Sequence, residues 1–437
     1  MNGAAAGYFQ AGQIFRPASS SFAAGLGLAF FALCALPSLI ALPGGEVTGG
    51  HTLMLLSLPV WFAAVLNRGH PVLDPLGRFA ASAILACTIA LIILAFLSAF
   101  TAEVPFRIMR PVVGLLAGPA LLMLMIGTAT RDRLYLYVSV LCLTIAATGA
   151  LTILATAEPS LHARVFRGTD RASGFFKNPN QFGMVLTTIL PVTFAMTLGA
   201  KKRRFLWLSA FAIMVVALML SGSKTSILTS SVALFLMLLL YVFIRYSGPA
   251  RVTMTIMSVF GALLTGSLLV IALANLNPRA LRLLNQAIVE GEATHSLVSR
   301  STLYRDSIEL FMSNPLLGVG AGQLISGYPH SHNLILDYAR TLGVPGVTFL
   351  LLLLIAVLVA SVALVLLALR SREHPLQDRL FCTGLAIGPV AYLVTNMSSD
   401  SLGPTTSPYF FSTLALGLVA RQLLTTSLYH MAGSRRP

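Results

Sequence analysis

Apolar runs of about 20 residues recur along this chain, separated by short polar segments, and a helix of that length crosses the hydrocarbon core of a bilayer. The composition agrees with a membrane protein. Of the 437 residues, 56% are hydrophobic and only 10% are charged, whereas a soluble domain has about 25% charged residues. The sequence therefore predicts an all-α polytopic membrane protein.

We predict about twelve transmembrane helices, with limits set by the apolar runs and by the charges beside them. The predicted spans cover residues 22–42, 51–66, 79–100, 108–129, 134–157, 181–199, 205–220, 226–244, 252–274, 346–369, 380–398 and 406–425. On this division, residues 1–274 hold spans 1 to 9, residues 275–345 form a helical loop, and residues 346–437 hold the last spans and a tail.

The basic residues predict the orientation. Segments such as RDR (131–133), KKRR (201–204) and RSREHPLQDR (370–379) alternate with turns that lack Lys and Arg, such as PGGEVTGG (43–50). Cytoplasmic loops carry the excess of Lys and Arg, so both termini are predicted to be cytoplasmic. Membrane topology also explains most of the net charge of +15, and no nucleic-acid partner is predicted.

The cysteines indicate neither a disulfide framework nor a metal site. Each lies inside an apolar segment, with no CxxC pair and no histidine nearby, so buried free thiols are predicted at Cys34, Cys87, Cys142 and Cys382.

Two predicted outer segments are long, residues 158–180 and 275–345. Long external loops are translocated regardless of charge, so their arginines are compatible with this topology. Within the second segment, apolar residues of ALRLLNQAIV (280–289) and STLYRDSIELFM (301–312) recur at helical spacing. We expect at least two amphipathic helices on the outer membrane face, followed by the Gly-rich turn NPLLGVGAGQ (314–323).

Many cations fall on the outer side in this topology. Lys224, in SGSKTS between two apolar spans, is the least expected, because a cation at the membrane boundary costs free energy unless it is paired. We interpret it as functional, and the alternative is a lysine that snorkels at a helix end. Arg300 and Arg305 are candidates for a phosphate clamp or for a solvated face with weak ion pairs. The outer set comprises Arg164, Arg167, Arg171, Lys177, Lys224, Arg279, Arg282, Arg300, Arg305, Arg340, His162, His295, His330 and His332.

The histidines of HSHN (330–333) follow the Gly-rich turn and precede a predicted helix. They can be ordinary polar residues at a helix start, but beside a cationic pocket one of them can be a general base. The GVGAG sequence does not fit a phosphate loop, since no strand precedes it and no GK[ST] follows. A basic pocket at bilayer level suits an anionic lipid headgroup such as a polyprenyl pyrophosphate. The cations would stabilise the departing pyrophosphate without a metal ion.

Four segments, in this order, resemble the bacterial O-antigen ligase and polysaccharide polymerase family: residues 172–191, 220–234, 299–323 and 330–346. The resemblance covers roughly residues 110–425. It implies a GT-C-like membrane glycosyltransferase of the bacterial inner (cytoplasmic) membrane, with a periplasmic active site and no metal or other cofactor. The implied donor is an undecaprenyl-pyrophosphate-linked glycan, and the implied acceptor is a hydroxyl of a lipid A-core sugar or of a growing polysaccharide.

The resemblance also implies roles for particular residues. His332, directly before Asn333, matches the family's essential histidine, and Arg300 matches the arginine that opens the amphipathic periplasmic segment. Lys224 stands where arginine is common in the family, and Tyr304 stands where many members have tryptophan. The catalytic candidates are therefore His332 and Arg300, and the substrate-binding candidates are Lys224, Arg305, His330, Asn333, Arg171, Lys177, Asn178 and Asn180.

Three other functions stay open from the sequence. A polymerase for O-antigen or exopolysaccharide would share the motifs of a ligase, and SKTS is similar to members tied to exopolysaccharide production. A lipid-oligosaccharide flippase or secondary transporter would also have about twelve spans, but transporters place ionisable residues near the midplane. Here the apolar spans hold essentially no Asp or Glu, which favours the enzyme. A structural scaffold would leave the cluster of His, Arg and Lys unexplained.

Overall fold

The computed structural model describes residues 38–42, 45–48, 73–128, 131–167, 170–200, 202–276, 295–328, 330–398, 402–403 and 405–425. Several predictions lie outside these residues. They are most of the first span, the whole second span (51–66), the helix predicted over ALRLLNQAIV, the C-terminal tail, and the positions Cys34, Arg279 and Arg282.

The end of the first predicted span is extended, not helical. Ser38–Leu42 (β1) and Gly45–Thr48 (β2) form an antiparallel hairpin in which Leu42 lies opposite Gly45. The sequence prediction was wrong at residues 38–42. The segment is short, it is followed by the turn-forming residues PGG, and it pairs with a partner strand that contains the β-branched residues Val47 and Thr48.

Helices coincide with the ten later predicted spans, and all except α13 begin within a few residues of the predicted start. They are α3 (Pro75–Leu97), α4 (Met109–Thr128), α5 (Arg131–Leu154), α7 (Pro179–Gly199), α8 (Arg204–Ser221), α9 (Lys224–Arg245), α10 (Gly248–Leu276), α13 (Leu334–Arg370), α14 (Leu376–Asn396) and α15 (Ser407–Ala420). Shorter elements are η2 (Ser98–Phe100), η3 (Pro105–Ile108), α6 (Pro159–Phe166) and α12 (His295–Ser313).

Seven of the described helical stretches are long and apolar enough to cross a membrane. They include the stretches that contain α3, α4, α5, α7, α8, α9 and α13. Large apolar side chains such as Leu228, Leu263 and Ile355 are exposed on these helices and on α10, as expected for surfaces that face lipid. The protein is therefore a multi-pass membrane protein. The predicted count of about twelve spans is not confirmed.

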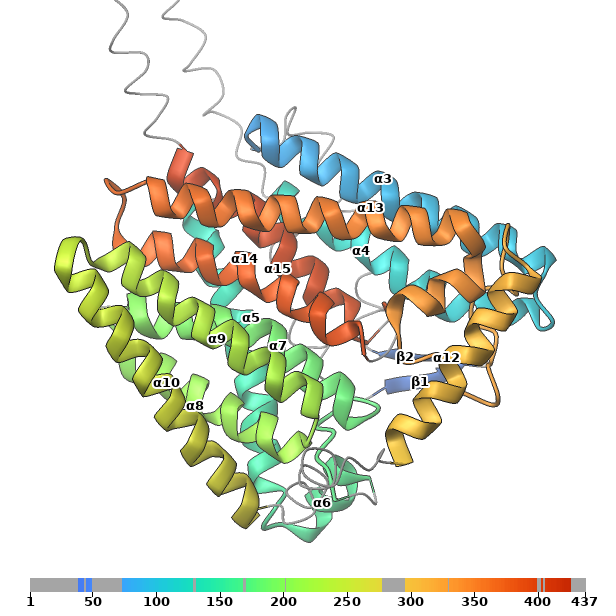
Figure 1. Cartoon of the computed structure of the whole chain (residues 1–437), viewed down its shortest axis with the longest axis horizontal. Coiled ribbons are helices and arrows are strands. Elements are labelled where there is room, and N and C mark those ends of the chain that lie inside the picture. Colours follow the sequence, from blue (N-terminus) through green and yellow to red (C-terminus); the bar gives the residue numbers. More distant parts are fainter. Residues whose placement is uncertain are drawn as a thin grey trace, which may run out of the picture.

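The polar segments that concern function lie at one end of the bundle. Figure 1 shows α6, α12 and the start of α13 at this end, which we call the α12 end, and the turns that join α9 to α10 and α13 to α14 at the other. At the α12 end, Ser398 beyond α14 donates to Thr225 of α9 at 2.9 Å. At the other end, Tyr135 of α5 donates to Asp378 of α14 at 2.6 Å.

A kink divides α13 and explains its early start. Gly343 has φ 65° and ψ −160°, a left-handed conformation that favours glycine. Pro345 follows and lacks the N–H that would continue the helix, while the N–H of Val344 donates to Pro315 of the Gly-rich turn at 2.8 Å. The predicted start at residue 346 is the start of the long spanning part. Residues 334–342 form a separate short helix at the α12 end.

An ion pair joins the first and last helices of the described bundle. Asp74 caps the start of α3 by accepting from the N–H of Gly77 at 3.0 Å. It also accepts two hydrogen bonds from Arg421, at 2.9 and 2.7 Å, and both side chains are largely buried. Burial alone would raise the pKa of Asp74, but the hydrogen bond and charge of Arg421 outweigh it, so the pKa lies below its ordinary value.

We expect Asp74→Asn to lower the free energy of unfolding by about 2 kcal/mol or more, because Arg421 would stay buried without its counter-charge. Thermal unfolding in detergent measures the loss. In the wild type the same stabilisation is present at neutral pH and is lost as the pH falls below about 4, since the folded state lowers this pKa. Arg305→Ala, at an exposed ion pair, is the control and should change stability little. If Asp74→Asn and Arg305→Ala lowered the free energy of unfolding equally, the structural role of the pair of Asp74 and Arg421 would be contradicted.

Candidate functional site

Arg171 is held in place by neutral oxygens. It lies in the loop between α6 and α7, and its Nε donates to the Ser221 carbonyl at 2.9 Å. Its Nη2 donates to Asn180 Oδ1 at 2.7 Å. Gly222, with φ 56°, lies against the guanidinium, where a Cβ would crowd Nε. Burial lowers the pKa of Arg171 below its ordinary value, yet an arginine stays charged at neutral pH.

Lys224 brings a second cation to the same place. It is the first residue of α9, directly after Ser223, and its side chain is exposed. The positive charges of both Arg171 and Arg300 act on it. Arg171, Lys224 and Arg300, which come from a loop and two helices, are therefore near enough for their charges to interact, and we call these three residues the cation cluster.

The faces of α12 separate Arg300 from Arg305. Leu303 and Ser307 are buried, at 3% and 0% exposure, and half-buried Arg300 lies three and seven residues before them on the same helical face. The Arg305 side chain is 72% exposed and lies 3.8 Å from Asp306 and from Glu309. Five residues along a helix turn the side chain by about 140°, so the structure does not bring the two arginines together as a clamp.

The loop with the two histidines packs against α12. Tyr304, one helical turn after Arg300, donates from its hydroxyl to the carbonyl oxygen of His332 at 3.3 Å. His332 has φ 55°, which is uncommon for a residue other than glycine, and its Nδ1 atom is buried. The backbone of His332 thus lies close to the face of α12 that carries Arg300.

A buried ion pair fixes this loop from the other side. Arg340 is fully buried, and its Nε and Nη2 donate to Asp337 Oδ1 at 3.1 and 2.7 Å. The same oxygen accepts from the N–H and hydroxyl of Ser331, at 3.2 and 3.3 Å. Arg340 is one of the predicted outer cations, and the structure pairs it with the carboxylate three residues earlier on α13.

Arg340 also holds the Gly-rich turn, residues 314–323. Its Nη1 donates to the Gln323 carbonyl at 3.0 Å, and its own carbonyl accepts from Val319 at 2.8 Å. Gly318 and Gly322, both with positive φ, lie against the backbones of Thr341 and of Arg107, where a Cβ would clash. The turn therefore packs closely between two neighbouring segments.

His330 lies beside the same carboxylate. Its Nδ1 is 3.8 Å from Asp337 Oδ2, and its side chain is 12% exposed. It borders a cavity that is described below, whereas His332 does not. The two histidines therefore have different surroundings, although only Ser331 separates them.

The other predicted residues have mixed positions. Asn178 caps α7 and Asn333 caps α13, since their side chains accept from the N–H groups of Gln181 and Leu336 at 2.9 and 3.0 Å. Capping a helix start is a structural role that explains an asparagine at both positions. Asn180 binds Arg171 as described above. Lys177 is exposed in the loop before α7.

Two further residues of this region, Asp337 and Gln323, were not predicted from the sequence. Asp337 does have a signal in the sequence. It lies three residues before Arg340 and shortly after the helix cap Asn333, and this spacing permits an ion pair on one helical face. Gln323 has no such signal, because it binds the backbone of Val104 more than two hundred residues away.

Within the described ranges, no three His, Cys, Asp or Glu side chains are grouped so that they could hold a metal ion. Cys87, Cys142 and Cys382 are buried free thiols, as predicted.

Comparison with known families identifies part of the chain. Residues 209–351, which run from α8 into α13, match the model of a family described as O-antigen ligase. The matched range holds Lys224, Arg300 and the histidine loop, and Arg171 precedes it. No curated protein matches the chain.

Proposed function

We propose that this protein is an O-antigen ligase-like glycosyltransferase, which transfers a glycan from undecaprenyl pyrophosphate to a hydroxyl of a lipid A-core sugar. In the proposed step the acceptor oxygen attacks the anomeric carbon of the donor sugar and forms the new glycosidic bond. The bond from that carbon to the phosphate oxygen breaks, and its electron pair leaves with the pyrophosphate. The hydroxyl proton passes to a histidine.

The observation that carries this proposal is the cation cluster at the α12 end. Guanidinium groups match phosphate oxygens through paired N–H donors, and lysine adds a point charge. Because Arg171 is already fixed by Ser221 and Asn180, it needs little reorganisation when the leaving group gains charge. Such preorganised electrostatic stabilisation accounts for much of the rate enhancement in many enzymes.

His332 is the proposed general base. A neutral imidazole accepts a hydroxyl proton near pH 7, and the Tyr304 contact puts the His332 backbone one helical turn from Arg300. A base near the phosphate-binding cations can reach a hydroxyl that attacks the sugar next to the phosphate. His330, which lies against Asp337, is assigned a different role below.

A polymerase is the second candidate, because the matched family covers ligases and polymerases. The two differ only in the acceptor, which is lipid A-core for a ligase and a second lipid-linked glycan for a polymerase. Purified protein incubated with undecaprenyl-pyrophosphate glycan and each acceptor in turn distinguishes them. Transfer to lipid A-core supports the ligase, chain elongation supports the polymerase, and no transfer to either contradicts the proposed reaction.

The proposed orientation places the α12 end in the periplasm of a bacterium with the protein in its inner membrane, and both termini in the cytoplasm. In a variant whose four cysteines are replaced by alanine, we expect Ser313→Cys on α12 to react with a membrane-impermeant maleimide in spheroplasts. Glu373→Cys, exposed in the turn after α13, should react only after lysis. The reverse pattern would invert the orientation.

We expect Lys224→Ala and Arg300→Ala each to slow transfer by about 100- to 1000-fold, the effect of losing one donor to a charged leaving group. Lys224→Arg should retain much activity, because the cation is kept. Turnover in detergent, with insertion verified by the maleimide assay, measures the effect. Normal turnover by Lys224→Ala would favour the interpretation of this residue as a snorkelling lysine.

We expect His332→Ala to slow transfer by about 100- to 10,000-fold, as for loss of a general base, with donor affinity nearly unchanged. His330→Ala should be less impaired at saturating acceptor. Turnover over a range of pH values, together with separately measured donor affinity, tests both variants. An inactive His330→Ala beside an active His332→Ala would mean that the base is the other histidine.

A further inference from the structure

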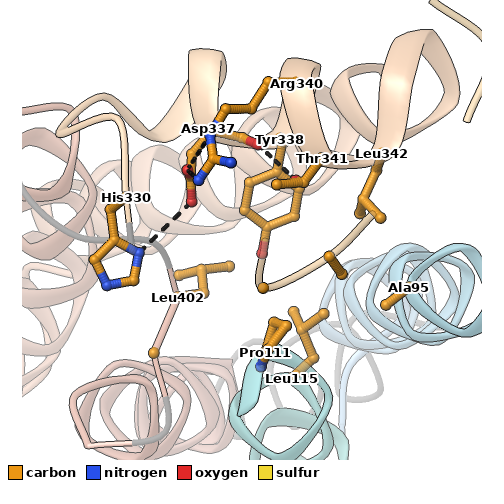
Figure 2. A pocket seen from close by; sticks show the side chains of 13 residues that line it. Ala95, Pro111, Leu115, His330, Asp337, Tyr338, Arg340, Thr341, Leu342 and Leu402 are labelled. Carbon is orange, nitrogen blue, oxygen red and sulfur yellow. Dashed lines mark hydrogen bonds and ion pairs between the residues drawn. The ribbon is translucent and has the colours of Figure 1, made fainter. Parts of the chain in front are cut away.

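A pocket that is partly open to its surroundings lies among α3, α4, the Gly-rich turn and the short first part of α13, and we call it the cavity. Figure 2 shows its apolar side, which Ala95, Pro111, Leu115 and Leu402 form. No residue of the cation cluster lines it. The residues that bind the donor in the proposed reaction therefore leave this space unused.

The polar side of the cavity comes from α13 and the histidine loop. Asp337 Oδ1 is occupied by Arg340 and Ser331, whereas Oδ2 faces His330 Nδ1 across 3.8 Å. Figure 2 shows His330 and Asp337 joined by this contact, with the ring of Tyr338 beside them. The cavity thus combines an apolar wall with a carboxylate and an imidazole.

These groups disfavour a phosphate. Arg340 is committed to Asp337 and to the Gln323 carbonyl, so its charge is balanced inside the protein. The nearest oxygen of Asp337 would repel an anion. A neutral polyol fits better, because its hydroxyls can donate to the carboxylate and exchange hydrogen bonds with the imidazole, and its C–H face can pack on apolar side chains.

We propose that this cavity binds the terminal sugar of the acceptor glycan, with His330 and Asp337 binding its hydroxyls. The inference rests on the proposed function, since it assigns the acceptor to one side of the histidine loop and the donor pyrophosphate to the other. His330 and His332 are two residues apart, which is at most about 7 Å of chain. His332 in turn contacts Tyr304, one turn from Arg300. A sugar in the cavity is therefore close to the proposed base.

The test fills the cavity from its apolar side, away from the cations. Ala95→Leu adds bulk at a fully buried position of α3 that lines the cavity. Ala86→Leu makes the same change on the exposed face of α3 and is the matched control. Leu402→Phe fills the cavity from another segment, and His330→Gln changes the polar side, so the test does not depend on the folding of one variant.

Two probes serve as acceptors, a lipid A-core glycolipid and an undecaprenyl-pyrophosphate-linked glycan. For the acceptor that the wild type uses, we expect the three cavity variants to raise the acceptor KM by about tenfold or more, with the donor KM unchanged. Ala86→Leu should match the wild type. An unchanged acceptor KM in all three variants, or an equal rise in donor KM, would overturn the assignment.

Direct binding separates this proposal from the proposed function. Binding of the lipid A-core glycolipid, which carries no donor pyrophosphate, to the detergent-purified protein is measured for the wild type and Ala95→Leu. If the wild type binds the glycolipid and Ala95→Leu weakens this binding by about tenfold, the assignment of the cavity to the acceptor sugar is supported. This holds even if no transfer occurs, in which case only the proposed reaction fails. Binding that Ala95→Leu leaves unchanged overturns the cavity assignment even if transfer is normal.

Discussion

The buried pair of Asp337 and Arg340 organises the α12 end of this protein. Taking both charges out of water is costly, and the cost is offset only because each group is otherwise satisfied by hydrogen bonds. Ser331 of the histidine loop binds the carboxylate, and Gln323 of the Gly-rich turn binds the guanidinium. One ion pair thus determines where the histidine loop and the Gly-rich turn lie relative to each other. The positions of His330 and His332 follow from it.

The bundle brings the cations to this end through close contacts between its helices. Ser226 of α9 and Ser223, directly before α9, lie against Gly183 of α7, where a Cβ would clash, so the start of α9 lies close to α7. Arg171 then joins the Ser221 carbonyl at the end of α8 to Asn180 at the start of α7. The O-antigen ligase match begins inside α8, and the contact that fixes Arg171 reaches outside it. The proposed donor site therefore needs segments on both sides of that limit.

Apolar length predicted the later helices well, because crossing a bilayer needs about 20 apolar residues whatever the tertiary structure. Features that depend on contacts between distant segments were not predictable in the same way. The start of α13 was missed because Gly343 and Pro345 break one helix into two parts that both remain helical. The burial of Arg340 was not predictable from the sequence, because it follows from packing on the Gly-rich turn. Helical geometry places Arg300 and Arg305 on different faces of α12. That inference requires α12 to be continuous between the two residues, which the structure shows.

The cation cluster has a consequence for the end of the catalytic cycle. In the proposed reaction the donor is a diphosphate esterified at both ends, whereas the lipid product ends in a free phosphate, which loses a further proton near pH 6. The product thus carries more negative charge than the donor, at the place where Arg171, Lys224 and Arg300 converge. The attraction that helps the leaving group to depart from the sugar also retains the spent lipid. Turnover would then be paced by release of undecaprenyl pyrophosphate into the bilayer, and an accumulating lipid carrier would act as a competitive inhibitor of its own glycosylated form.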